Sequence, residues 1–397
     1  MNTKHTHTRT RHLLALLTAA LLTSAAHAQL TIPSDGSDGA FAPVANVEID
    51  LGLATTALWN TPGSGNGVYD AEKWAVVFKY SSVSIPNGVK VTFKNHPTYA
   101  PVVWLVQGNV AIAGELNLDG KNKNASQPES LIPTEPGPGG FRGGASGPAG
   151  YGIGLGTGGG LGADGSGAYQ GQYGNPQILP LIGGSGGNSG GGGGGCIAIF
   201  ASQSVTISGL VSARGGVGTY GHPWGNPVNF GSGGAIKIVA ATVSGTGTIS
   251  SLFPNTVLPG RLRIETNTLA PSLQTTPETI GVPPANPPVI WPAVNAPIAK
   301  VVSVDAVNAP VDPRAPLVAG ADVAIQNSNQ VNILIETQNF PIEGVVQLYI
   351  TPKFGTWDSR KVLNATRLNG DITSATWRVQ TTLPQGFVTL QARATQP

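Results

Sequence analysis

The sequence contains little cysteine, little charge and few long apolar runs. Its single cysteine, Cys196, cannot form a disulfide within the chain. Cys196 follows six glycines and opens an apolar stretch, which predicts a packed core thiol rather than a reactive one. Charged residues make up only 11% of the 397 residues, so large charged surfaces are not expected.

The only long apolar run belongs to a leader at residues 1–28. Lys4, Arg9 and Arg11 form a basic start, Leu13–Leu22 is apolar, and Ala26-His27-Ala28 is a small-x-small cleavage site. The run is too short to span a bilayer as a mature helix, and no later run approaches ~20 apolar residues. We therefore predict a signal peptide and an exported protein of the periplasm, cell surface or extracellular space, without a membrane span after leader removal.

The charge balance argues against nucleic acid as a partner. Without the three basic residues of the leader, 19 basic residues stand against 20 acidic ones, a net charge near −1. The formal net charge of +2 for the whole chain thus comes from the leader. The remaining sequence has no basic cluster of the kind that binds DNA or RNA.

A repeated phrase predicts the fold of the first two thirds of the chain. It occurs at Val110–Gly114, Val205–Gly209 and Ala241–Gly245, each time after an alternating apolar strand and with glycine at its end. Residues 102–118 align with 197–213 without a gap, while the third copy follows its strand three residues sooner. Such units bury an apolar face by stacking, which favours an all-β fold with a single-stranded parallel β-helix over residues 29–270. A β-sandwich or another all-β fold remains the alternative.

The predicted β-helix at 29–270 also includes an N-terminal segment and a long insertion. Residues 29–73 contain many turn signals and are expected to cap the open end of the stack or form its first turn. Strands are expected at 74–80, 83–85, 89–93 and 102–107. A glycine-rich insertion at 121–195 separates the two aligned copies, and the stretch Gly137–Gly195 holds 28 of the 56 glycines. This segment is expected to be a mobile or polyglycine-like loop without a core of its own.

The last third changes character twice. The last strand of the stack is expected at Arg261–Glu265, and residues 271–297, with eight prolines, are typical of an extended linker. Residues 298–397 predict an immunoglobulin-like or fibronectin-like β-sandwich with Trp377 as its core aromatic residue. Its strands are expected at 300–304, 323–326, 331–336, 345–350, 375–380 and 387–394.

Four phrases carry a resemblance to a known group of proteins. Asp35–Phe41, Gly67–Asp70, Trp74–Tyr80 and Phe93–Pro97 resemble a group of uncharacterised, exported, glycine-rich bacterial proteins with a predicted parallel β-helix. The resemblance covers roughly residues 30–120. It implies export and a β-rich solenoid, and it brings no catalytic residues with it.

Short motifs in the glycine-rich part match functional signatures only formally. Gly183–Gly187 and Gly187–Gly191 fit G-x-S-x-G, but the flanking strand and helix of a nucleophile elbow are missing. Gly154–Gly159 fits G-x-G-x-x-G without a βαβ unit. Gly159–Asp164 resembles half of a calcium-binding repeat, but it is a single copy and Ser166 replaces an apolar residue. We assign no catalytic residue, no metal site and no cofactor.

Two sets of residues are the remaining candidates for a site. β-Helix enzymes that act on polysaccharides place acids and bases on one outer face, and the charged residues near the repeats are Glu115, Asp119, Lys121, Lys123, Arg214 and Lys237. They are scattered singly, which favours solvated edges and rims. Tyr220, His222 and Trp224 could instead stack on sugar rings or contact another protein; the alternative is that Pro223 and Trp224 only pin their loop.

These observations favour a non-enzymatic structural or adhesive protein of the cell surface or extracellular matrix. The expected partners are a polysaccharide or another cell-surface protein, through Tyr220, His222 and Trp224. The alternative is a polysaccharide-binding or polysaccharide-degrading β-helix protein.

Overall fold

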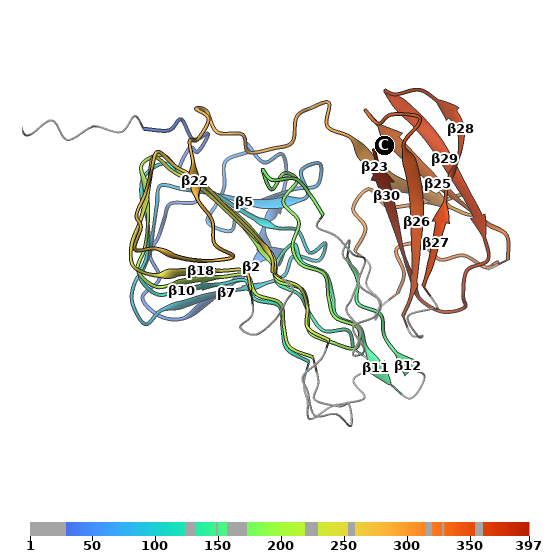
Figure 1. The fold of residues 1–397 in the computed structure, drawn as a ribbon, viewed down its shortest axis with the longest axis horizontal. Helices are drawn as coiled ribbons and strands as arrows, with labels where there is room; N and C mark the ends of the chain where they lie inside the picture. The colour runs from blue at the N-terminus through green and yellow to red at the C-terminus, as the bar shows by residue number, and fades with distance from the viewer. Residues whose placement is uncertain are drawn as a thin grey trace, which may run out of the picture.

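The computed structural model describes residues 29–123, 132–147, 150–156, 173–218, 229–252, 259–314, 320–327, 329–353 and 360–396. These residues form an all-β protein with three parallel sheets followed by two antiparallel sheets (Figure 1). Within the described ranges the helical structure is the short 3-10 turn η1 (Leu51–Leu53). No helix in these ranges is long and apolar enough to cross a membrane. The leader predicted at residues 1–28 lies outside them.

Strands that are mostly far apart in the sequence lie side by side in the three parallel sheets, which we call A, B and C. From one edge to the other, sheet A contains β1 (Ala40–Phe41), β6 (Ser82–Ile85), β9 (Val110–Ile112), β14 (Ser204–Ile207), β17 (Thr242–Ser244) and β20 (Thr268–Leu269). Sheet B contains β2 (Val47–Asp50), β7 (Lys90–Lys94), β10 (Glu115–Asn117), β15 (Leu210–Ser212), β18 (Thr248–Ser250) and β21 (Gln274–Thr276). Sheet C contains β22 (Gly281–Val282), β19 (Arg261–Glu265), β16 (Ala235–Val239), β13 (Cys196–Ala201), β8 (Val102–Val106), β5 (Ala75–Tyr80), β4 (Val68–Asp70) and β3 (Thr55–Thr56). Only β4 and β5 pair antiparallel among these neighbours.

The chain visits the sheets in a fixed rotation from β5 onward, first C, then A, then B. In Figure 1 the strands of successive turns lie over one another. Val102 pairs with Ile197, Val110 with Val205, and Leu116 with Val211. Each pair is 95 residues apart, the same separation as in the side-chain contact of Asn109 with Ser204. The gapless alignment predicted from the sequence is therefore confirmed as strand pairing.

The predicted register of the third copy is wrong by two residues. Val205 pairs with Val243 rather than with Ala241, although Ile197 pairs with Ile236 as expected. The join between the two strands is thus one residue shorter than in the preceding turn, not three. A two-residue shift leaves the inward and outward alternation unchanged, so the apolar pattern could not distinguish the two registers.

The side chains that point into the space between the three sheets form one continuous core. Val76, Val102, Ile197 and Ile236 form one paired row of this core in sheet C, and each is fully buried. An aromatic group fills the first turns, where the Trp104 ring lies 5.7 Å from that of Tyr80. The core supports the prediction that these units are stable only when stacked.

Residues 29–73 supply the first strands of the stack. β1 pairs with β6 and β2 pairs with β7, so this region supplies the outermost strands of sheets A and B. Leu51 in η1 is fully buried in the core. It therefore covers apolar side chains that would otherwise face water.

The predicted linker at 271–297 begins as part of the stack. β21 pairs with β18 and β22 pairs with β19, so the sheets continue past Arg261–Glu265. The segment then returns along the outer face of sheet C, where the side chain of Asn286 accepts a hydrogen bond from the amide of Thr31 at 2.9 Å. The prolines of this segment lie outside β21 and β22, where no strand pairing requires their missing N–H groups.

The glycine-rich segments pack side by side where the chain passes from sheet B to sheet C. We call the segments 118–123, 134–145, 152–155, 183–195, 213–217 and 229–234 the glycine bundle. Most of them lack regular strand structure, yet backbone hydrogen bonds connect each to its neighbours and most of their residues are buried. Figure 1 shows them projecting from one corner of the stacked sheets. The described part of the insertion is thus polyglycine-like, and it has a hydrogen-bonded interior that was not predicted.

The hydrogen bonds of the central segment repeat every three residues. The amides of Gly192 and Gly195 donate to Lys121 and Leu118, at 3.0 and 2.8 Å. The amides of Gly191 and Gly194, one residue earlier, donate to Asn229 and Ser232, and those of Gly193 and Cys196 donate to Phe141 and Pro138. A period of three is that of the polyproline II helix, which has no internal hydrogen bonds and directs its amides outward in three directions.

The C-terminal region forms two antiparallel sheets around a separate core. Sheet D contains β24 (Val307–Asn308), β23 (Ile298–Val304), β25 (Val331–Gln338), β29 (Ser374–Thr381) and β28 (Thr366–Gly370). Sheet E contains β27 (Lys361–Asn364), β26 (Val345–Pro352) and β30 (Val388–Thr395). A two-stranded hairpin of β11 (Ser146–Gly147) and β12 (Gly150–Tyr151) lies apart from these sheets.

Five of the six strands predicted in this region are confirmed. The prediction at 323–326 is wrong, because Val323 and Ile325 pack on the core without pairing as a strand. β27 and β28 were missed because their side chains are mostly exposed and do not alternate. Trp377 is buried in the core as predicted, and its indole N–H donates to the hydroxyl of Thr337 at 2.9 Å.

Gly192→Ala should destabilise the protein because its methyl group would lie 2.1 Å from the carbonyl oxygen of Glu135. Overpacking of this kind costs about 1–3 kcal/mol, so the free energy of unfolding in urea should fall by that amount. Gly52→Ala is the matched control, because its nearest neighbour is a side-chain oxygen at 3.1 Å. Equal stabilities for the two variants would contradict the close packing of the bundle.

Candidate functional site

The ligand-binding residues predicted from the sequence, Tyr220, His222 and Trp224, lie outside the described residues. The described residues on either side of them belong to the glycine bundle. Before the gap, the carbonyl of Val217 accepts a hydrogen bond from the amide of Lys123 at 2.8 Å; after it, the carbonyl of Asn229 accepts one from Gly191 at 3.0 Å. The chain thus leaves and re-enters a hydrogen-bonded scaffold around these three residues.

Three of the scattered charged candidates come together on the outer face of sheet B. The carboxylate of Glu115 lies 2.9 Å from the ammonium of Lys90 on the neighbouring strand. Asp119 accepts two bonds from the guanidinium of Arg214, at 3.0 and 3.1 Å. Asn117 lies between them and donates to Glu115 at 2.7 Å and to Asp119 at 3.3 Å. We call Lys90, Glu115, Asn117, Asp119 and Arg214 the sheet B cluster.

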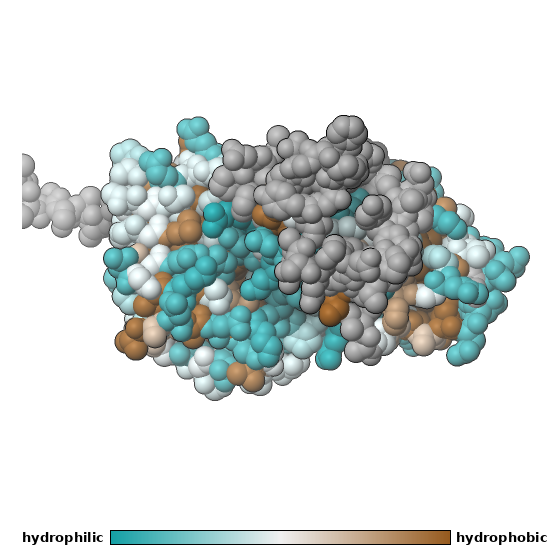
Figure 2. Space-filling view, turned by 90° about the horizontal axis from the view of Figure 1, so that it is seen from below, coloured by the Kyte–Doolittle hydropathy of each residue, from teal (hydrophilic) through white to brown (hydrophobic). Residues whose placement is uncertain are grey.

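The sheet B cluster is suited to binding hydroxyl groups rather than to acid catalysis. Burial tends to raise the pKa of Glu115, but the hydrogen bond from Asn117 and the ion pair with Lys90 together lower it below its usual value. An ionised carboxylate cannot act as a general acid at neutral pH. Figure 2, which views the molecule from below, shows that the surface under sheet B is mainly hydrophilic. The cluster therefore offers fixed acceptors and donors to a polar ligand.

The expectation that all six charged candidates are solvated is wrong for Lys123 and Lys237. Lys121 is exposed, but Lys123 is 6% exposed and its ammonium donates to the carbonyls of Ile132 and Gly144 at 3.4 and 3.3 Å. Burial lowers the pKa of Lys123. Lys123 thus connects two described segments of the chain, 118–123 and 132–147.

Lys237 belongs to a buried ionic group on the outer face of sheet C. Its side chain is 1% exposed and its ammonium lies 3.2 Å from the carboxylate of Glu265. The same carboxylate accepts a bond from Arg263 at 2.6 Å, and Lys237 also donates to the carbonyl of Gln177 at 3.1 Å. Burial lowers the pKa of Lys237, and Glu265 opposes this shift. The nearby carboxylate favours the protonated form of the lysine against this effect of burial.

This ionic group is buried because sheet C is covered on both faces. A second apolar cluster on its outer face contains Val103, Phe200, Leu30 and Ile290, with the rings of Trp59 and Trp291 5.7 Å apart at its margin. The uninterrupted apolar run at 102–106 was the sequence signal for two-sided burial. Cys196 lies in this cluster, fully buried, and burial raises the pKa of its thiol, as expected for a core residue.

A polar cluster joins the glycine bundle to the preceding turn of the stack. The hydroxyl of Tyr99 donates to the carboxylate of Glu135 at 3.1 Å and accepts a bond from Arg142. The Arg142 guanidinium also lies 4.4 Å from the centre of the Tyr99 ring. Burial, together with Glu135, raises the pKa of Tyr99 to about 12. A neutral tyrosine held by two partners in this way positions the bundle and is not a base at neutral pH.

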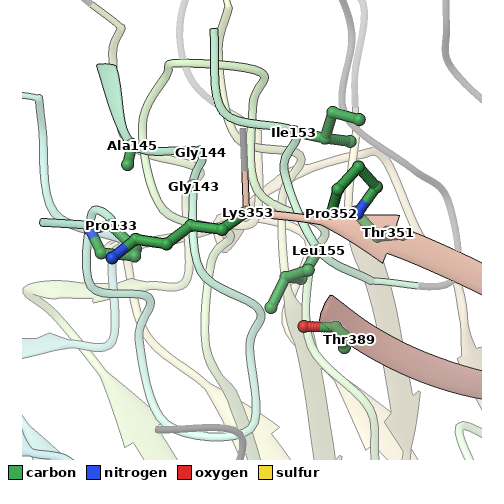
Figure 3. A pocket seen from close by; sticks show the side chains of 10 residues that line it. All are labelled: Pro133, Gly143, Gly144, Ala145, Ile153, Leu155, Thr351, Pro352, Lys353 and Thr389. Atoms are coloured by element: carbon green, nitrogen blue, oxygen red, sulfur yellow. The ribbon is translucent and has the colours of Figure 1, made fainter. Parts of the chain in front are cut away.

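A small crevice lies between the glycine bundle and the end of sheet E (Figure 3). Pro133, Ala145 and Leu155 line it on the bundle side, and Pro352, Lys353 and Thr389 line it on the other. Its volume of about 10 Å³ matches a single water molecule. The crevice is a packing contact between the two parts of the chain and holds no ligand-sized space. No group of three or more metal-ligating side chains occurs in the described ranges.

Comparison with known proteins gives no relative. No family model, curated protein or solved structure matches the chain.

Removing the negative charge of Glu265 should be costly because Lys237 would remain buried without a counter-charge. Glu265→Gln should lower the free energy of unfolding by about 3–5 kcal/mol, as expected for a broken buried ion pair. The double variant with Lys237→Met should recover most of this loss, since it leaves no charge to bury. A double variant as unstable as the single one would show that the pairing with Lys237 is not the cause.

The contribution of Glu115 should depend on pH. Its pKa is lower in the folded protein than its usual value, so its stabilisation is present above the usual value and is lost as the pH falls through the lowered one. At pH 7 Glu115→Gln should cost about 0.5–1 kcal/mol, because the side chain is partly exposed and its ion pair is screened. The difference from the wild type should vanish in acid, as measured by urea unfolding at several pH values. Glu48→Gln on β2, two strands away in the same sheet, is the control, and an equal effect there would refute a specific role for the cluster.

Proposed function

We propose that the chain is an exported, non-enzymatic adhesive or structural protein of the cell surface or extracellular matrix. In this proposal the three parallel sheets are the walls of a parallel β-helix, and sheets D and E form a β-sandwich that follows it. The fixed rotation of the chain through sheets C, A and B supports the first assignment. The core shared by strands of sheets D and E supports the second.

The observation that carries the proposal is the glycine bundle and the loops whose ends it holds. Lys123 and Val217, which stand close before the undescribed segments 124–131 and 219–228, are hydrogen-bonded to each other. The second loop contains Tyr220, His222 and Trp224. Function resides disproportionately in loops that a rigid scaffold positions, and aromatic side chains bind sugar rings through their faces. We infer that these three residues contact a polysaccharide or another surface protein.

The charged groups support binding rather than catalysis. In the sheet B cluster both carboxylates are engaged by a cation and by Asn117. A polysaccharide hydrolase of the usual kind needs one carboxyl group that can give up a proton. The alternative function, binding or cleavage of a polysaccharide on the sheet B face, rests on the same cluster because it presents two carboxylates on an accessible surface.

Residues 29–397 should be retained on at least one member of a panel of insoluble polysaccharides and should release no new chain ends. Trp224→Ala should lose most of this retention, while Trp224→Phe should keep it, because phenylalanine preserves a stacking face. The measurement is a pull-down combined with a reducing-end assay, with and without calcium. New chain ends that disappear in Glu115→Gln or Asp119→Asn would establish the enzymatic alternative. Retention unchanged in Trp224→Ala would rule out the loop as the binding surface.

A further inference from the structure

The C-terminal sheets have one long open edge. β30 is the last strand of sheet E and pairs only with β26, over all eight residues from Val388 to Thr395. The other edge of β30 therefore presents unpaired backbone donors and acceptors. Its side chains that face the core, including Val388 and Leu390, remain partly exposed, whereas alternate residues of β25 are buried. β23 of sheet D approaches this side of β30 without pairing with it, so the edge lacks a hydrogen-bonded neighbour but does not face open solvent along its whole length.

Apart from residues 298–302 of β23, which β24 does not reach and which flank the same groove, the other edges that the structure describes are blunted in ways that β30 is not. β1, β3, β20, β22 and β24 have two residues each, and β21 has three. β2 carries Glu48 and Asp50, β27 begins with Lys361, and the pairing of β28 shifts register next to Arg367. Short strands, charges and bulges are the devices that prevent edges from pairing with other chains. β30 contains neither proline, lysine nor a carboxylate, and its one charged residue, Arg393, donates to Tyr349 within the same sheet.

An apolar groove of about 1030 Å³ runs along this edge. Residues 388–392 of β30 form one wall, and β23 with the segments 309–313 and 320–326 forms the other. Val301, Val323 and Ile325 present apolar side chains to it, and each is only partly buried against the core. The charged lining consists of one cation and one anion, Lys300 and Asp322.

We propose that this groove binds an extended peptide strand, which adds to sheet E beside β30. A polypeptide in β conformation is the ligand whose amides and carbonyls alternate with the spacing that a strand edge requires. The apolar walls call for apolar side chains at every second position of the ligand. The balanced charge of the lining favours an uncharged peptide, and the residues 388–392 of β30 that line the groove allow a ladder of about 17 Å.

The test uses residues 29–397 and a fluorescein-labelled peptide of alternating threonine and valine capped by serine. Fluorescence anisotropy should show saturable binding. The same peptide with its valine nitrogens methylated should not bind, because it lacks the donors that would face β30. Equal binding of the two peptides, or none by the unmodified peptide, would overturn the proposal.

Matched arginine substitutions locate the binding. Ala324 is exposed and lines the groove, so Ala324→Arg should weaken binding at least ~tenfold, while exposed Ala293→Arg outside the groove should not. If Ala324→Arg lowers the melting temperature, Gln385→Arg on the opposite wall replaces it. Size-exclusion chromatography tests whether a second copy of the chain occupies the groove instead. A wild-type dimer that Ala324→Arg converts to a monomer would overturn the peptide proposal and assign the groove to a second copy.

Discussion

The close approach of glycine backbones is the constraint on which the middle of the molecule depends. A methyl group at Gly194 would lie 2.2 Å from the carbonyl oxygen of Ala213, and one at Gly234 would lie 1.7 Å from that of Gly195. Few of these glycines have a positive φ, so glycine is required at these positions for space rather than for an unusual backbone conformation. The segments gain backbone hydrogen bonds from this proximity but little apolar burial. Since glycine also loses the most conformational entropy on folding, the bundle needs its ends fixed by something else.

The stacked sheets fix those ends. Each crossing from sheet B to sheet C starts and finishes in paired strands, so equivalent residues of two turns enter the bundle in register. Asp119 and Arg214 stand one turn apart at its entrance, and the side chain of Asn122 accepts a hydrogen bond from the amide of Val217 with the same 95-residue separation. At the exit, Cys196 and Ala235 are paired and fully buried. The apolar rows of the sheets thus set the alignment of segments that have few side chains of their own to set it.

The sequence predicted the sheet register where two turns are identical in length, and it failed where they are not. Val102 and Ile197 align because the strands and turns that follow them match residue by residue. The sequence alignment paired Ala241 with Val205, whereas Val243 is the actual partner. A shift of the strand by two residues keeps the same side chains pointing into the core, so the apolar pattern fits both pairings. The burial of Lys237 on the outer face of sheet C could not be predicted from its own strand. The residues that accept its hydrogen bonds there, Gln177 and Val289, come from distant segments. The bundle has no signal in apolar periodicity, since its order lies in contacts between backbones.

The edge strand β30 of the C-terminal sheets lies next to the glycine bundle. Thr389, near the start of β30, lines both the groove beside that strand and the crevice against the glycine bundle. A strand paired with β30 would therefore run toward the bundle, whose loops carry the aromatic residues proposed to bind a surface ligand. The stacked sheets end in strands of two to four residues, and the longest of these, β2, carries Glu48 and Asp50, which disfavours pairing with another molecule. The unpaired edge of β30 and the glycine bundle therefore lie next to each other. Both features proposed to bind other molecules are thus in one region of the protein.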